Sequence, residues 1–128
     1  MPKLLRVAPE LPVSNLRAAL EHYESALGFH TAMEMPGGGY AIVERGDVAI
    51  HLFEDVARSH TPSSIHIFAT GLDDLYAELD QRGARIHQPI VSQPWGCRDF
   101  RVRDNSGNEI KFTEPLPENS ISGLATPE

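Results

Sequence analysis

The sequence predicts an α+β fold of two βαβββ modules, each a curved, mostly antiparallel four-stranded sheet with its helix on the outer face. Three observations support this fold class. The order strand, helix, strand, strand, strand occurs twice in 128 residues. The two predicted helices end at corresponding glycines, Gly28 and Gly83. The segments GDVAIHLFE and GNEIKFTE also correspond, which pairs His51 with Lys111 and indicates an internal repeat.

The first module covers residues 4–54. Its first predicted strand, residues 4–13, alternates in hydrophobicity but contains two prolines, which suits an edge strand or a crossover. Asn15 is a good N-cap, apolar residues then recur at helical spacing, and Gly28 is expected to end the helix. Three further strands, FHTAMEM, YAIVE and VAIHLFE, are separated by the turns PGGG and RGD.

The second module covers residues 64–114 and follows a polar, irregular connection over residues 55–64. SIHIFAT predicts a strand, and GLDDLYAELDQRG predicts a helix with one apolar face. ARIHQPIV, RDFRVRD and EIKFTE predict the last three strands. The tail, residues 115–128, is rich in Pro, Ser, Glu and Asn, so we expect it to be flexible.

Length and composition favour one soluble domain over residues 1–128. The formal net charge of −7 disfavours nucleic-acid binding, and it is compatible either with a cationic ligand or with solubility alone. No apolar run is long enough to span a membrane, and the start of the chain does not read as a secretory segment. With a single cysteine, Cys97, the chain is expected to be cytoplasmic.

A family resemblance adds to this interpretation. QPWGCRDFRVRDNSGNEIKF resembles the signature of bleomycin-resistance proteins, which belong to the glyoxalase/bleomycin resistance/dioxygenase (vicinal oxygen chelate) superfamily. That signature has Pro-Trp-Gly, an aromatic strand, Asp-x-x-Gly-Asn and a closing strand. LPVSNLRAALEHYESALGF and GLDDLYAEL resemble the family's first strand with its helix and its second helix. The resemblance covers residues 4–114 and implies a cleft lined by alternate strand residues.

The resemblance also implies where a metal would bind. Superfamily enzymes hold a divalent ion with one ligand on each of four strands, and those positions carry over to Ala8, His51, Ser64 and Lys111. His51 alone among them is a good ligand, and an ammonium group at Lys111 would repel a cation. We therefore predict no metal and no cofactor, as in the metal-free binding branch. An unusual site formed by Glu10, His51 and His66 remains a minor alternative.

We predict that the ligand-binding residues line this cleft. Trp95 offers a planar stacking surface between Pro94 and Gly96, although it could instead plug the end of the barrel. Tyr40 follows three glycines and could be a binding aromatic or an ordinary cross-strand residue. His51 could contact ligand or be a hydrogen-bonded interior histidine, and Lys111 could meet an anionic group or extend to the cleft rim. The full predicted set is Trp95, Tyr40, His51, Phe53, Ser64 and Lys111.

No catalytic acid–base pair or nucleophile stands out, so a binding protein is favoured and enzyme activity is left open. The first hypothesis is a protein that sequesters a bleomycin-type antibiotic or a similar cationic, planar ligand. The second is a metal-dependent lyase, isomerase or dioxygenase with rearranged ligands. The third is a binding module for another metabolite. The resemblance further implies a homodimer, in which the first strand could be exchanged between subunits so that both chains build each cleft.

Overall fold

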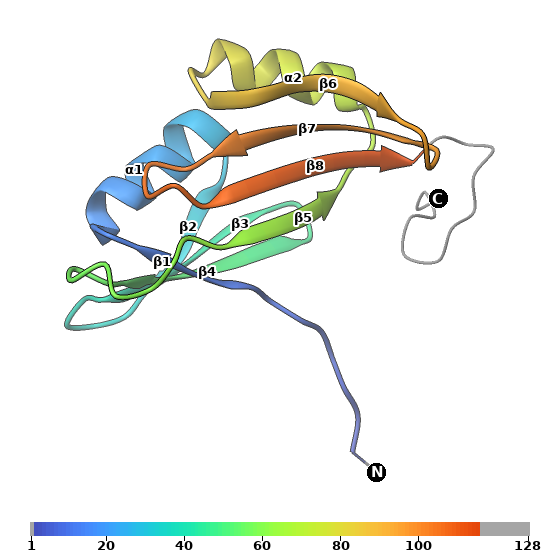
Figure 1. The fold of residues 1–128 in the computed structure, drawn as a ribbon. Coiled ribbons are helices and arrows are strands. Elements are labelled where there is room, and N and C mark those ends of the chain that lie inside the picture. Colours follow the sequence, from blue (N-terminus) through green and yellow to red (C-terminus); the bar gives the residue numbers. More distant parts are fainter. Residues whose placement is uncertain (1, 116–128) are drawn as a thin grey trace.

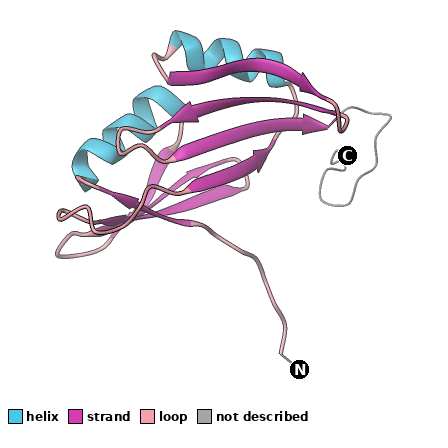
Figure 2. Cartoon of the chain, viewed as in Figure 1, coloured by secondary structure: helices cyan, strands magenta, loops and turns pink. Residues whose placement is uncertain are grey.

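The computed structural model describes residues 2–115, and they form two four-stranded sheets (Figures 1 and 2). The first module consists of β1 (Glu10–Val13), α1 (Leu16–Leu27), β2 (His30–Glu34), β3 (Tyr40–Arg45) and β4 (Val48–Glu54). The second consists of β5 (Ser64–Phe68), α2 (Leu72–Gln81), β6 (Arg85–Gln93), β7 (Cys97–Arg103) and β8 (Glu109–Pro115). The predicted α+β fold of two βαβββ modules is confirmed.

The two sheets have the same topology. Their strand orders are β1-β4-β3-β2 and β5-β8-β7-β6. In each sheet the first strand of the module runs parallel to the last, and the other neighbours are antiparallel. We call the sheet of the first module sheet A and that of the second sheet B. The repeat predicted from the sequence is thus present in the strand pairing.

The helix ends follow the sequence signals. The side chain of Asn15 accepts a hydrogen bond from the Ala18 N–H at 2.9 Å, and Gly28 adopts a left-handed conformation with φ 73° at the end of α1. In α2 the first turn carries Asp73 and Asp74, which the positive end of the helix dipole favours. The two helices pack on separate sheets, α1 on β2–β4 and α2 on β6–β8. No helix in residues 2–115 is long and apolar enough to span a membrane.

The turn between β7 and β8 joins the two modules. The Tyr23 hydroxyl of α1 donates to Asp104 Oδ2 at 2.8 Å, and Asn108 Nδ2 donates to the Pro12 carbonyl at 2.7 Å. Tyr23, Asp104 and Asn108 are all fully buried. Burial, followed by the Asp104 carboxylate, raises the pKa of Tyr23 well above its usual value. The Asp-x-x-Gly-Asn motif of the sequence therefore serves here as a structural joint.

The first strand is shorter than predicted. We expected a strand over residues 4–13, but β1 begins at Glu10, and the residues before it form an exposed arm (Figure 1). The Pro9 carbonyl still accepts from the His51 N–H at 2.9 Å, but proline has no N–H with which to continue the ladder. Leu4, Leu5 and Val7 are consequently almost fully exposed. The predicted flexible tail lies, beyond Pro115, outside the described residues.

Candidate functional site

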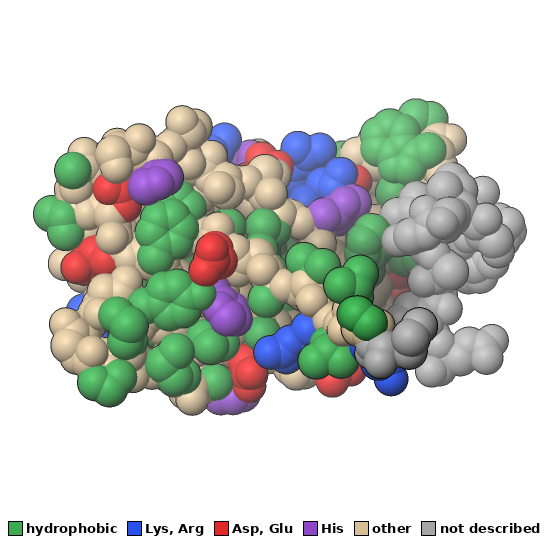
Figure 3. Space-filling model, turned by 90° about the horizontal axis from the view of Figure 1, so that it is seen from below, with side chains coloured by type: hydrophobic (Ala, Val, Ile, Leu, Met, Phe, Trp, Pro, Cys, Tyr) green, Lys and Arg blue, Asp and Glu red, His purple; other side chains and the backbone are tan. Residues whose placement is uncertain are grey.

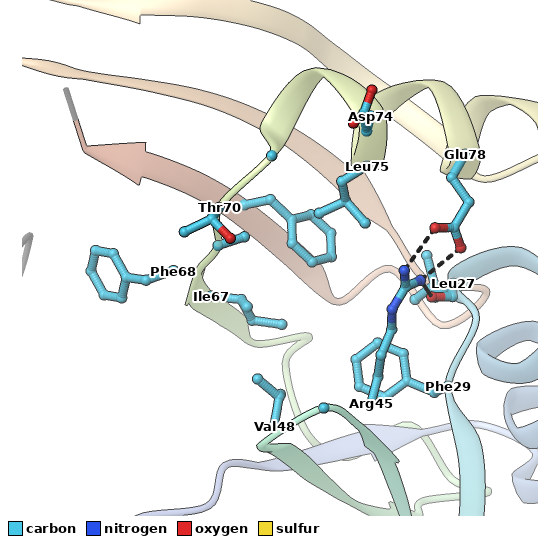
Figure 4. Close-up of a pocket in the computed structure, with 14 residues that line it drawn as sticks. Leu27, Phe29, Arg45, Val48, Ile67, Phe68, Thr70, Asp74, Leu75 and Glu78 are labelled. Carbon is cyan, nitrogen blue, oxygen red and sulfur yellow. Dashed lines mark hydrogen bonds and ion pairs between the residues drawn. The ribbon is translucent and has the colours of Figure 1, made fainter. Parts of the chain in front are cut away.

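A cavity lies where the two modules meet (Figure 4). Its volume is about 580 Å³, which is in the range of small-molecule sites. The walls come from the end of α1, the β3–β4 turn, β5, β8 and the start of α2. Most are apolar, and they include Leu27, Phe29, Val48, Ile67, Leu75 and Phe112. None of the six residues predicted from the sequence lines this cavity.

An ion pair forms the polar wall of the cavity. Arg45 at the end of β3 reaches across to α2 and donates to both carboxylate oxygens of Glu78, at 2.8 and 2.7 Å (Figure 4). It also donates to the Leu27 carbonyl at 2.9 Å, while Arg82 donates to Glu78 at 2.8 Å. Hydrogen bonds from Arg45 lower the pKa of Glu78 to about 2. A Cβ at Gly28 would lie 2.5 Å from a guanidinium nitrogen of Arg45. A side chain at this position would therefore push Arg45 away from Glu78. Arg45 and Glu78 are thus hydrogen-bonded to protein groups, so the cavity offers a ligand mainly apolar surface.

Five of the six predicted residues, all but Trp95, lie on the other side of the sheets. We call the two sheet faces that the helices leave uncovered the open faces. Figure 3 shows the molecule from below the view of Figure 1, with histidine, acidic, basic and hydrophobic side chains together on this side. On sheet A the open face carries Glu10, Tyr40, Ile42, His51 and Phe53. On sheet B it carries Ser64, His66, Gln88, Asp99, Arg101, Glu109, Lys111 and Thr113.

A hydrogen-bonded group occupies the open face of sheet A. The Tyr40 hydroxyl lies 2.7 Å from Glu10 Oε2 and 2.6 Å from His51 Nδ1. The bond to Glu10 is the main reason that the pKa of Tyr40 is raised. The rings of Tyr40 and His51 meet edge to face with centroids 5.7 Å apart, and Phe53 meets His60 in the same way at 5.2 Å. Three of the predicted residues, Tyr40, His51 and Phe53, are thus gathered here.

Basic side chains form a row across the open face of sheet B. His66, Lys111 and Arg101 lie side by side on β5, β8 and β7. Partial burial, followed by the charge of Lys111, lowers the pKa of His66. Glu109 counters part of this charge, since it pairs with Arg101 at 3.1 Å and with His87 at 3.3 Å. The predicted Ser64 hydroxyl lies 3.3 Å from the same Glu109.

Asp99 is a buried carboxylate beside this row. The side chain is fully buried, and Oδ1 accepts from Gln88 Nε2 at 2.7 Å and from Gln93 Nε2 at 3.3 Å. Oδ2 has no hydrogen-bond partner within residues 2–115. Trp95 lies in the turn just before β7 with 50% of its surface exposed. Sequence reasoning missed Asp99 and Arg101 as open-face residues, although their alternation in RDFRVRD carried that signal.

The family resemblance gave Ala8 and Ser64 as the positions that share a metal site with His51 and Lys111. The strand register places other residues beside His51 and Lys111. Glu10 is opposite His51, and His66 is opposite Lys111, whereas Ser64 is opposite Glu109. Glu10 and His51 are on sheet A and His66 is on sheet B. Across the described part of the chain, no three His, Cys, Asp or Glu side chains are grouped as a metal site would require.

Comparisons with known proteins agree with this fold. Residues 3–112 match the family model described as Glyoxalase/Bleomycin resistance protein/Dioxygenase superfamily. A bleomycin resistance determinant encoded on the transposon Tn5 is 21% identical with a TM-score of 0.78, over 88% of this chain and 98% of that one. A bleomycin-binding protein complexed with bleomycin is 21% identical with a TM-score of 0.73, over 86% of this chain and 98% of that one.

An enzyme is also among the similar structures. Lactoylglutathione lyase from Agrobacterium tumefaciens is 17% identical with a TM-score of 0.71, over 89% of this chain and 96% of that one. No curated protein sequence matches the chain. At these identities the solved structures establish the fold, and they include both binding proteins and an enzyme.

Proposed function

Because the chain belongs to the glyoxalase/bleomycin resistance protein/dioxygenase superfamily, we propose that it binds a small molecule on its open faces. We further propose that the ligand is planar and cationic, of the bleomycin type, and that the protein acts by sequestering it in the cytoplasm. The observation that carries this proposal is Trp95, a half-exposed indole between Pro94 and Gly96 in the turn that joins β6 and β7 of sheet B. Such a ring can stack on a planar ligand and attract a cation to its face.

The remaining predicted residues have compatible roles in this proposal. Tyr40 and Phe53 supply further aromatic surface on sheet A, and His51 supplies a hydrogen-bonding nitrogen. Ser64 and Lys111 lie on sheet B. Lys111 stands beside His66, so a metal ion bound by that histidine would meet an ammonium group, and the cationic group of the ligand is expected beside Glu10 on sheet A instead. The charge of Lys111 favours a binding function without metal or cofactor.

A homodimer would complete the site. The arm of residues 2–9 exposes Leu4, Leu5 and Val7, and the exposed apolar set also includes Met33, Met35 and Phe68. Such surface favours burial against a partner. On the open face of sheet B, Arg101 is paired with Glu109, whereas the ammonium group of Lys111 can meet the carboxylate of Glu10 on a facing sheet A. We propose that sheet A of one chain faces sheet B of the other, with the arm exchanged.

The ligand proposal is tested by titrating the protein with bleomycin while recording the emission of its single tryptophan. We expect saturable quenching or a shift of emission, because Trp95 is the stacking surface. Replacement of Trp95 by Phe removes the signal, so calorimetry of the variant gives the matched comparison. Unchanged emission together with no heat of binding would refute the assignment of a bleomycin-type ligand.

A second candidate function is metal-dependent catalysis. It is favoured by the adjacency of Glu10 and His51, two metal-ligating residue types, on neighbouring strands. In the proposed dimer, His66 of the partner subunit could add a third donor. Metal analysis of the purified protein separates the two functions: one divalent ion per chain would favour the enzyme, and a metal-free protein that binds ligand would favour sequestration.

A further inference from the structure

The Tyr40 hydroxyl lies between two partners and has one proton to give. Its oxygen is 2.7 Å from Glu10 Oε2 and 2.6 Å from His51 Nδ1. Both distances are those of good hydrogen bonds, so each contact contains one proton. The three residues come from β1, β3 and β4, where strand pairing fixes Glu10 beside His51 and Tyr40 beside Phe53.

Counting protons gives a direction to the chain of bonds. An ionised carboxylate can only accept, so Tyr40 donates its proton to Glu10. The Tyr40 oxygen must then accept, and the remaining proton is supplied by His51 as Nδ1–H. The raised pKa of Tyr40, caused first by the bond to Glu10, agrees with a phenol that donates to an anion.

The other ring nitrogen of His51 is left without a proton. A neutral imidazole carries one N–H, and the hydrogen bond made by one nitrogen sets the state of the other. Nε2 of His51 is buried and has no hydrogen-bond partner in the described part of the chain.

We infer that Glu10 and Tyr40 are positioning residues that hold His51 as the Nδ1–H tautomer, and that His51 Nε2 is the hydrogen-bond acceptor for an N–H or O–H group of the ligand. The ligand class is therefore one that offers a donor at this point, such as an amide, amidinium, ammonium or hydroxyl group. A carboxylate, which only accepts, would face the lone pair of Nε2. The ligand part of this inference rests on the proposed function; the tautomer does not.

The tautomer can be read by long-range ¹H–¹⁵N NMR on the ligand-free full chain at neutral pH. The chain has six histidines, and a His51→Gln variant identifies the signals of His51. We expect Nδ1 to carry the proton and Nε2 to be unprotonated. A predominant Nε2–H form in the wild-type protein would overturn the inference.

Two variants test the role of the carboxylate. Glu10→Gln can donate its amide N–H to the Tyr40 oxygen, so Tyr40 would donate to His51 Nδ1 and the proton would move to Nε2. Glu44→Gln is the matched control on the same sheet, because Glu44 pairs weakly with His30 at 3.7 Å and should leave the tautomer unchanged. Both positions are at least partly exposed, so folding should be retained. Tyr40→Phe leaves the His51 Nδ1–H without its acceptor and should also raise the share of the Nε2–H form. An unchanged tautomer in both Glu10→Gln and Tyr40→Phe would contradict the relay.

A pair of planar probes of equal size tests the acceptor. Acetamidinium has only donors and acetate has only acceptors. At equal concentrations, we expect acetamidinium to shift the His51 Nε2 signal in the wild-type protein and to shift it less in Glu10→Gln. A shift with acetate alone, or no shift with either probe, would overturn the acceptor role. Absence of bleomycin binding with the expected tautomer and acetamidinium shift would instead refute the proposed antibiotic ligand.

Discussion

Replacement of Tyr23 by Phe should weaken the joint between the two modules. The substitution removes the hydrogen bond from the buried Tyr23 hydroxyl to Asp104 Oδ2 at 2.8 Å and leaves the ring packed against Phe29. A hydrogen bond to a charged group contributes about 1.5–3 kcal/mol. Asp104 Oδ2 keeps the hydrogen bond from Asn108 Nδ2 at 2.9 Å, so the buried carboxylate oxygen still has a donor. We therefore expect a loss near the lower end of that range, about 1.5 kcal/mol.

Chemical denaturation monitored by circular dichroism measures this loss. The matched control is Tyr76→Phe, since Tyr76 also packs edge to face on a buried aromatic ring, Phe100, and its hydroxyl makes no hydrogen bond within residues 2–115. The control should change the free energy of unfolding by less than about 0.5 kcal/mol. Equal stability of Tyr23→Phe and wild type would refute the view that the bond from Tyr23 to Asp104 strengthens the joint between the modules.

Three further predictions concern charge, assembly and the exposed indole. The folded-state pKa of Glu78, about 2, lies below its usual 4.5, so the bonds from Arg45 stabilise the fold above about pH 4.5 and lose their effect as the pH falls towards 2. Because both side chains are about one-third exposed, Glu78→Gln should cost only about 1 kcal/mol at pH 7 and should flatten stability between pH 5 and about 2, as measured by urea titration. Deletion of residues 2–9 should convert a dimer to a monomer in light scattering, and a monomeric wild-type protein would contradict the proposed arm exchange. Trp95→Ala should leave the melting temperature nearly unchanged, because the side chain is 50% exposed, yet weaken ligand binding in calorimetry; unaltered affinity would remove Trp95 from the site.

Local signals explain why much of the fold could be predicted. Asn15 and Gly28 mark the ends of α1 through their own hydrogen bonding and backbone conformation, and both act as expected. Alternation along the strands likewise predicts which side chains share a face. The start of β1 depended instead on whether an exposed strand finds a partner beyond Pro9, which is a matter of tertiary structure.

The site was less accessible to sequence reasoning because it depends on register and module packing. Strand pairing places Glu10 and His66, two residues along from Ala8 and Ser64, beside His51 and Lys111. The apolar cavity forms only where α1 and α2 come together at the module junction, so no single motif could indicate it. The link from Glu10 through Tyr40 to His51 likewise joins the β3–β4 hairpin to β1, which lies far earlier in the sequence.

The most direct test of the proposed function is calorimetric titration of the purified full chain with bleomycin, accompanied by metal analysis of the same sample. The proposal predicts saturable binding by metal-free protein, a higher melting temperature in the presence of ligand, and weaker binding by Trp95→Ala. No heat and no change in melting temperature would contradict sequestration of this ligand, and binding that requires a stoichiometric divalent ion would contradict a metal-free site.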